Sequence, residues 1–387
     1  WPACSSSARS ISTAAAARTI RAARRLAHGS HDQRLLGLID TWLATVLCSR
    51  MQLQPAIALM ERVIRDSRRQ GRTDQLAGQY NVLASCLTTR GDYPSAAVAV
   101  GESLDCALGS NNPQALLWAL VCAAEADIFR GQLERAETSL REIEMLRGVG
   151  YSFESEFHIA LMSFYIAYER CDFEATLAPL AQARALCRAD MASRTILVDI
   201  LHDFVCVETW RFGDLKVLRS LTEEQLSVGR DFNAIYPAAH SYRLALQLLD
   251  GDWPAMLATV KRLCRVVRRS GNALWAGWVA QAAVGAAHRL GLPDVADALA
   301  TLSRQVLDRC GIVPTPRQIN TWRSLDALLP LLPPLPPGSA PSDAVAMIER
   351  LPRDLADWCA FAREPCGIEA QHPPPRKLPK PKPKPKA

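Results

Sequence analysis

Residues 91–96 read GDYPSA, and similar short junctions recur about every 40 residues along the chain. The seven junctions begin at Met51, Gly91, Gly131, Cys171, Gly213, Gly251 and Gly291, with successive gaps of 40, 40, 40, 42, 38 and 40 residues. A fixed period in this range is typical of solenoids, whose units are too small to bury their apolar faces alone and therefore stack on one another. The pattern predicts a tandem repeat protein.

Each junction separates two segments of helix length, which we call the first and the second helix of a unit. The first helices are expected at 34–49, 76–89, 114–130, 154–169, 194–210, 234–249 and 272–289. Two residues after the junction the side chain is large and apolar in six of seven units, and five residues after it the side chain is mostly small. This spacing favours a close helix crossing. A glycine at the junction suits the left-handed conformation that ends a helix.

The turns starting at Gly91, Gly131 and Gly251, followed in the first two units by Ala96 and Ala136, resemble those of the tetratricopeptide repeat. The resemblance covers about residues 10–312, although the units run about 40 residues instead of 34. The longer spacing is similar to the sensor regions of bacterial LuxR-type ATP-dependent activators and of repeat-bearing diguanylate cyclases. It implies an all-α fold, namely a right-handed α-solenoid of about seven helix-turn-helix repeats.

Changes in composition along the chain predict five parts. We expect a partial N-terminal repeat or helix at 1–30, a helical-repeat solenoid with a C-terminal cap at 31–327, a proline-rich linker at 328–342, a short helical segment at 343–364 and a disordered Pro/Lys tail at 365–387. Within the cap, 321–329 is expected to be helical. Within the fourth part, 343–349 and 353–363 read as two short helices.

The net charge of +6 is confined to the end of the chain. The last fifteen residues hold six basic side chains and no acid, and the remaining residues hold 39 basic and 39 acidic side chains. A neutral body does not favour nucleic-acid binding. The tail itself has three readings: a solubilising end, a weak electrostatic contact with an anionic partner, or a proline-rich docking segment. No apolar run approaches the length of a membrane span.

The chain shows no motif typical of an enzyme, a cofactor site or a metal centre. Its twelve cysteines occur singly, without the paired spacing of zinc ligands. The sequence contains no phosphate-binding loop, nucleophile elbow or His-Glu-x-x-His motif. We therefore expect a non-catalytic protein of the reduced cytoplasm without a cofactor, which binds a protein or peptide. The alternative is a sensory or regulatory module of a bacterial regulator whose output domain lies outside this chain.

In the tetratricopeptide family, the first helices line a concave groove, and the resemblance places its contacts about 13, 10, 6, 3 and 2 residues before each junction. The candidates read at these positions are Asn81, Trp118, Glu125, Phe129, His158, Tyr165, Tyr168, Asp203, Trp210 and Arg211. The aromatic members could anchor a peptide, or they could pack between neighbouring helices. Likewise, His158, His202 and His240 recur near 40-residue spacing, as a ligand row or as packing histidines.

Overall fold

The structure is a computed structural model that describes residues 13–29, 32–110, 112–146, 153–187, 250–270, 272–317 and 342–360, together with isolated positions and pairs between 198 and 247. Every regular element in these ranges is a helix, and they contain no strand. Each of these helices is too short or too polar to cross a bilayer. The all-helical fold class predicted from the repeats is therefore confirmed for the described residues.

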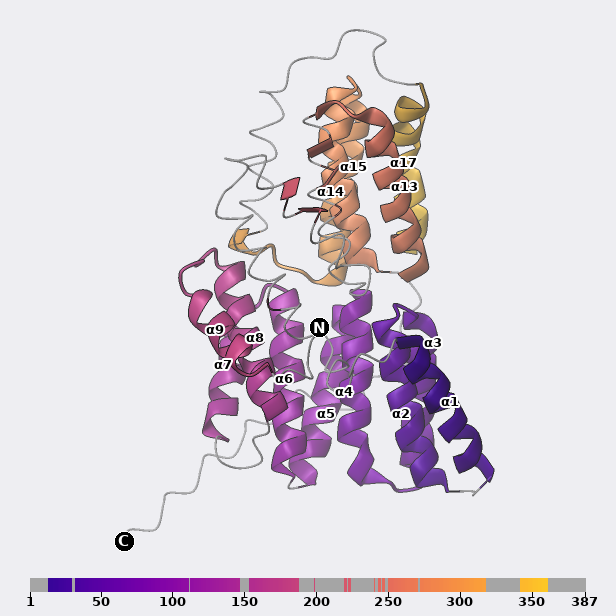
Figure 1. Cartoon of the computed structure of the whole chain (residues 1–387), viewed down its shortest axis with the longest axis vertical. Helices are drawn as coiled ribbons and strands as arrows, with labels where there is room; N and C mark the ends of the chain where they lie inside the picture. The colour runs from indigo at the N-terminus through magenta and orange to yellow at the C-terminus, as the bar shows by residue number, and fades with distance from the viewer. Residues whose placement is uncertain are drawn as a thin grey trace.

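The helices form two groups (Figure 1). The first group consists of α1 (Thr13–Gly29), α2 (Gln33–Ser49), α3 (Leu53–Arg69), α4 (Thr73–Arg90), α5 (Tyr93–Gly109), α6 (Pro113–Phe129), α7 (Leu133–Met145), α8 (Phe153–Glu169) and α9 (Leu177–Ala185). The second group consists of α13 (Trp253–Ser270), α14 (Ala273–Arg289), α15 (Pro293–Cys310) and α17 (Ser342–Ala360).

The predicted junctions end their first helices in the same way. Positive φ angles occur at the junction residues Met51, Gly91, Gly131, Cys171, Gly251 and Gly291, and Gly213 lies outside the described residues. In all six units the amide after the junction donates to the carbonyl five residues earlier, at 2.8–3.1 Å. This bond completes the Schellman motif, which satisfies carbonyls left over at the helix end. The junction prediction is confirmed at these six positions.

The positions after the junction also pack as the repeat pattern predicts. Leu53, Tyr93 and Leu133, two residues past their junctions, are buried, and the small residues at five past, such as Ala56 and Ala96, have no exposed surface. Small residues at a crossing let two helices approach closely, while each large apolar side chain contributes about 1.5–3 kcal/mol by leaving water. The turns and the helix contacts are therefore encoded together in one short stretch.

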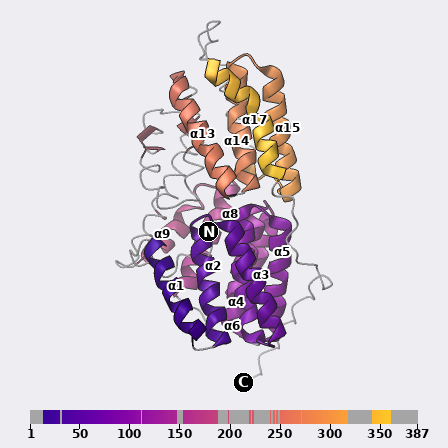
Figure 2. The same cartoon turned by 90° about the vertical axis from the view of Figure 1, so that its right-hand side faces the viewer.

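Successive helices from α1 to α9 pack against one another in chain order. The first helices also contact each other directly, α2 with α4, α4 with α6 and α6 with α8. Figure 2 shows α2, α4 and α6 on one side of the first group and α3 and α5 on the other. The first helices thus form a row with a shared outer face.

The second group lies beyond the ends of the first-group helices, with its helices along the same long axis (Figures 1 and 2). Asn272 joins the groups: its side chain accepts a hydrogen bond from the amide of Trp275 at 3.0 Å and donates to the carbonyl of Thr89 at 2.5 Å. It therefore caps the start of α14 and satisfies a carbonyl in the last turn of α4. Buried apolar side chains of both groups belong to one core cluster.

The chain after α15 makes a second connection between the groups, which we call the 311–317 segment. The amide of Val313 donates to the carbonyl of Arg130, at the turn between α6 and α7, over 2.9 Å. The hydroxyl of Thr315 donates to Glu169, the last residue of α8, at 2.6 Å. Arg317 donates twice to the same carboxylate, at 3.0 and 3.1 Å. The segment is thereby fixed to two neighbouring repeat units.

The structure corrects one prediction at the C-terminal end. The expected pair of short helices is a single helix, α17, which continues through Pro352. Buried side chains run along one face of it, at Ala344, Ile348, Leu351 and Leu355, and α17 packs against α13, α14 and α15. Burial of this stripe offsets the hydrogen bond that proline cannot donate. The predicted cap helix at 321–329, the linker at 328–341 and the tail at 365–387 lie outside the described residues.

Candidate functional site

The aromatic residues predicted for the groove come together on α6 and α8. The rings of Trp118 and His158 meet edge to face, with 5.2 Å between their centroids. Phe129 and Tyr165 lie 6.5 Å apart in a tilted arrangement. Because α6 and α8 are neighbouring first helices, side chains at equivalent positions of the two units become neighbours in space.

Most of these candidates are buried. His158, Tyr165 and Tyr168 expose 3%, 8% and 6% of their surface, and Glu125 is similarly covered. The ring of Tyr168 stacks on Phe164, and the guanidinium group of Arg317 lies 4.9 Å from its centre. These four side chains present little surface to a ligand. Trp118 and Phe129 remain half-buried.

The remaining candidates are distributed differently. The side-chain oxygen of Asn81 accepts a hydrogen bond from Ser103 of α5 at 2.7 Å, which ties this first helix to its own second helix. Asp203, Trp210 and Arg211 fall in the part of the chain that is not described. Of the predicted set, the structure therefore brings Trp118 to His158 and Phe129 to Tyr165. Three further candidates are not placed.

The predicted histidine row is represented by two of its three members. His158 packs between Trp118 and Phe157, and His240 is buried, while His202 lies outside the described residues. Burial, reinforced by the positive charges of Arg262 and Arg243, lowers the pKa of His240 from 6.5 to about 4. Among the described residues no group of three or more metal-ligating side chains occurs.

The lowered pKa of His240 predicts a pH-dependent stability. Between pH 6.5 and about 4 the unfolded chain binds a proton at this histidine and the folded chain does not, so the free energy of unfolding falls as the pH drops through this window. Above pH 6.5 the histidine is neutral in both states and contributes nothing. Urea unfolding at pH 7 and pH 5 should show a smaller loss for His240→Gln than for the wild type. The exposed His288→Gln variant on α14 is the control, and an equal loss in all three proteins would contradict the prediction.

Residues outside the predicted set form the most exposed apolar surface of the first helices that the structure describes. Leu35, Leu38 and Trp42 on α2 expose 41%, 49% and 45% of their surface. Their spacing of three and four residues places them on one face of the helix. The repeat register could have revealed one of them, because Leu38 lies 13 residues before its junction, the position that Trp118 and His158 occupy in later units.

The same register places a glycine beside this apolar face. Gly78 of α4 is exposed, and a Cβ atom at this position would meet nothing within 4 Å. It lies between the positions of Leu38 on α2 and Trp118 on α6, and neighbouring helix axes are about 8–10 Å apart. A glycine inside a helix costs about 1 kcal/mol relative to alanine. We name the surface of Leu35, Leu38, Trp42, Gly78 and Trp118 the first-helix face.

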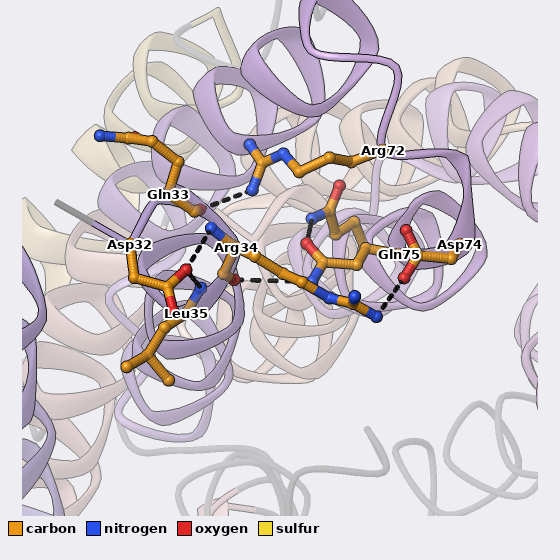
Figure 3. Close-up of polar contacts among 8 residues, drawn as sticks. Asp32, Gln33, Arg34, Leu35, Arg72, Asp74 and Gln75 are labelled. Carbon is orange, nitrogen blue, oxygen red and sulfur yellow. Dashed lines mark hydrogen bonds and ion pairs between the residues drawn. The ribbon is translucent and has the colours of Figure 1, made fainter.

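Polar contacts fix the end of α2 that carries this face (Figure 3). Arg34 of α2 pairs with Asp74 of α4 at 2.6 Å, and Arg72 donates to the carbonyl of Gln33 at 2.6 Å. The carboxylate of Asp32 caps the helix by accepting from two backbone amides of its first turn, at 2.9 and 3.0 Å. Arg34 and Asp74 lie in the first turns of α2 and α4, so their ion pair holds the starts of the two helices together. Leu35 and Leu38 therefore lie on a helix end that is anchored to its neighbour.

Comparison of the chain with protein-family models gives no match. A comparison with curated proteins also gives none. The function is therefore inferred from the geometry and the chemistry of the described residues.

Proposed function

We propose that the chain is a non-catalytic helical-repeat scaffold that binds a protein or peptide segment on its first-helix face. In this proposal the units continue as a right-handed, tetratricopeptide-like solenoid, and the partner crosses α2, α4 and α6. The order of helix contacts along α1–α9 and the six equivalent junctions support this arrangement. Binding of this kind requires no catalytic group.

The observation that carries the proposal is the exposure of three large apolar side chains on one anchored helix face. Leu35, Leu38 and Trp42 each expose more than two fifths of their surface. Contiguous exposed apolar side chains are typical of interaction sites, and tryptophan is enriched among the residues that dominate binding energies. Beside them, the missing side chain of Gly78 leaves room for a group of the partner.

The test is a selection of peptides that bind the full-length chain, followed by affinity measurements with variants. Trp42→Ala is expected to weaken the selected peptides at least about tenfold, since truncating a central aromatic anchor costs about 1.4 kcal/mol or more. Leu177→Ala is the matched control, because Leu177 is an exposed apolar residue on α9, away from the first-helix face. Unchanged affinity for Trp42→Ala, with the fold intact by circular dichroism, would refute the assignment of this face.

A second variant tests the open position on α4. Gly78→Phe fills the space above the helix and is expected to weaken the peptides that Trp42→Ala weakens, without loss of stability, because a Cβ meets no atom there. Gly101→Phe adds the same ring on the second helix α5, where a Cβ is also unobstructed. Equal binding by both variants would show that the partner does not cross α4 at Gly78.

A further inference from the structure

The α1–α2 hairpin gathers most of the exposed large apolar side chains in the described part of the chain. Four of the seven lie on it: Leu26, which is 78% exposed, and the three residues of α2 in the first-helix face. The pair of Arg24 and Asp40, 2.5 Å apart, sets the register of this antiparallel hairpin. In that register Leu26 of α1 lies level with Leu38 of α2.

Helix geometry places these side chains on the same side of the hairpin. Asp40 also contacts Arg62 of α3 at 3.5 Å, so Asp40 and Arg24 mark the side that faces α3. At about 100° per residue, Leu38 and Trp42 each lie about 200° around α2 from Asp40. Leu26 lies about 200° around α1 from Arg24 by the same count. All three therefore point away from α3 and continue the first-helix face onto α1.

An arginine stripe lies on the outer face of α1, with Arg25 next to Leu26 in sequence and about 100° around the helix from it. Arg18, Arg21 and Arg25 are exposed and follow one another at intervals of three and four residues on α1, a helix without any acidic residue. None of the ion pairs among the described residues involves them. The two carboxylates nearest to the stripe in sequence are already engaged, Asp32 as the cap of α2 and Asp40 in the pair with Arg24. Leu26 therefore shares its helix with exposed positive charge that enters no ion pair in the described structure.

We infer that the partner of the first-helix face is an acidic amphipathic helix. Its apolar side covers Leu26, Leu38 and Trp42, and its carboxylates face the arginine stripe. This inference rests on the proposed function and adds the chemistry of the partner. Amphipathic helices bind to apolar grooves between helices, and complementary charge at the rim selects among them.

The distribution of charge over the chain favours a short acidic partner over an extended anionic surface. Apart from the last fifteen residues, the chain holds equal numbers of acidic and basic side chains. A nucleic acid or a membrane surface is bound by a broad field of positive charge. The arginine stripe of α1 lies on a helix that also carries an exposed large apolar side chain, Leu26, whereas the basic stripe of α13 does not. The α1 stripe therefore matches a partner with both properties in one short segment.

The test uses three designed helical peptides of about 18 residues with the same leucine stripe. They carry Glu, Gln or Lys at the flanking positions, and their binding to the full-length chain is measured by fluorescence anisotropy. The Glu peptide is expected to bind at least about tenfold more tightly than the Gln peptide at low ionic strength, with a smaller advantage at high salt. The Lys peptide is expected to bind most weakly.

The variant that tests the stripe combines Arg18→Gln, Arg21→Gln and Arg25→Gln. It should remove the advantage of the Glu peptide and leave the affinity of the Gln peptide unchanged. The control combines Lys261→Gln, Arg265→Gln and Arg268→Gln, which removes the same charge from an exposed stripe of α13 and should preserve the advantage. Trp42→Ala should weaken the Glu and the Gln peptides together.

The outcomes separate this inference from the proposed function. Equal affinity for the Glu and Gln peptides, with both lost in Trp42→Ala, overturns the acidic partner and leaves the binding face intact. If neither peptide binds the wild type, both ideas fail at this surface. Binding to phosphatidylserine vesicles or to duplex DNA that depends on the arginine stripe, without binding of the peptides, also overturns the inference.

Discussion

Replacing Gly131 by alanine is expected to lower the free energy of unfolding by about 3 kcal/mol or more. Gly131 has a φ angle of +72°, and a Cβ atom there would lie 1.9 Å from the carbonyl oxygen of Val313. The added Cβ atom and the carbonyl oxygen of Val313 are each attached directly to backbone that is held by hydrogen bonds. Neither atom can therefore move aside at small cost. Relief of the clash requires displacement of the 311–317 segment, with loss of the hydrogen bond from Val313 to Arg130.

Gly291→Ala is the matched control for this variant. Gly291 occupies the same position of its own repeat unit and has a φ angle of +69°, but a Cβ atom there meets nothing within 4 Å. It should therefore cost only the strain of a left-handed alanine, about 1–2 kcal/mol. Urea unfolding of both variants measures the difference. Equal losses would mean that the contact between Gly131 and Val313 does not hold the fold together.

The comparison of these two glycines also shows what the sequence can predict. The left-handed conformation follows from a local pattern, and the period locates it even at Met51 and Cys171, which are not glycines. The contact of Gly131 with Val313 joins residues far apart in the chain and leaves no local signal. For the same reason the packing of the second helix group on the ends of the first was not predicted.

The candidate site shows the same limit. The register gave Trp118 and His158 the same position in adjacent units, and the structure shows that these two side chains meet in space. It left open whether the aromatic candidates anchor a peptide or pack between helices, because burial depends on every element that packs around a side chain. Leu38 occupies one of the five groove positions but is neither aromatic nor polar, and Trp42 lies nine residues before its junction, at none of these positions. Exposure is a tertiary property, which the pattern of a single unit does not contain.

Pro352 illustrates a local rule that tertiary packing overrides. Proline inside a helix commonly breaks it, and two short helices are the local expectation. The apolar stripe of α17 continues in helical register on both sides of the proline, from Ile348 to Leu355, and is buried against three helices. The packing energy of the whole stripe exceeds the cost of one missing hydrogen bond.

Glu169→Ala is expected to destabilise the fold by about 3 kcal/mol. The carboxylate accepts three hydrogen bonds from Thr315 and Arg317, and the side chains of Glu169 and Arg317 are only 13% and 16% exposed. Removing one member of a largely buried ion pair leaves the other charge poorly solvated, which typically costs about 3–5 kcal/mol. We take the lower end because both side chains keep some contact with water. Urea unfolding measures the loss.

Asp354→Ala provides the control for that prediction. It breaks the pair of Arg350 and Asp354 on α17, a single 3.0 Å contact between residues four apart whose arginine is 60% exposed. Exposed pairs of this kind contribute about 0.3–0.5 kcal/mol. A loss at Asp354 as large as that at Glu169 would contradict the importance given to the buried pair.

Combining Gly131→Ala with Glu169→Ala tests whether the 311–317 segment docks as one unit. Gly131 contacts Val313, whereas Glu169 holds Thr315 and Arg317, so the two substitutions act on different residues of the same short segment. If alanine at 131 already detaches the segment, removal of the Glu169 carboxylate then breaks fewer contacts. The loss of unfolding free energy in the double variant should therefore be smaller than the sum of the two single losses by about 1–2 kcal/mol. Losses that add to within about 0.5 kcal/mol would mean that the two contacts form independently. Cooperative docking would make this segment the element that joins the α6–α7 turn and the end of α8 to the second helix group.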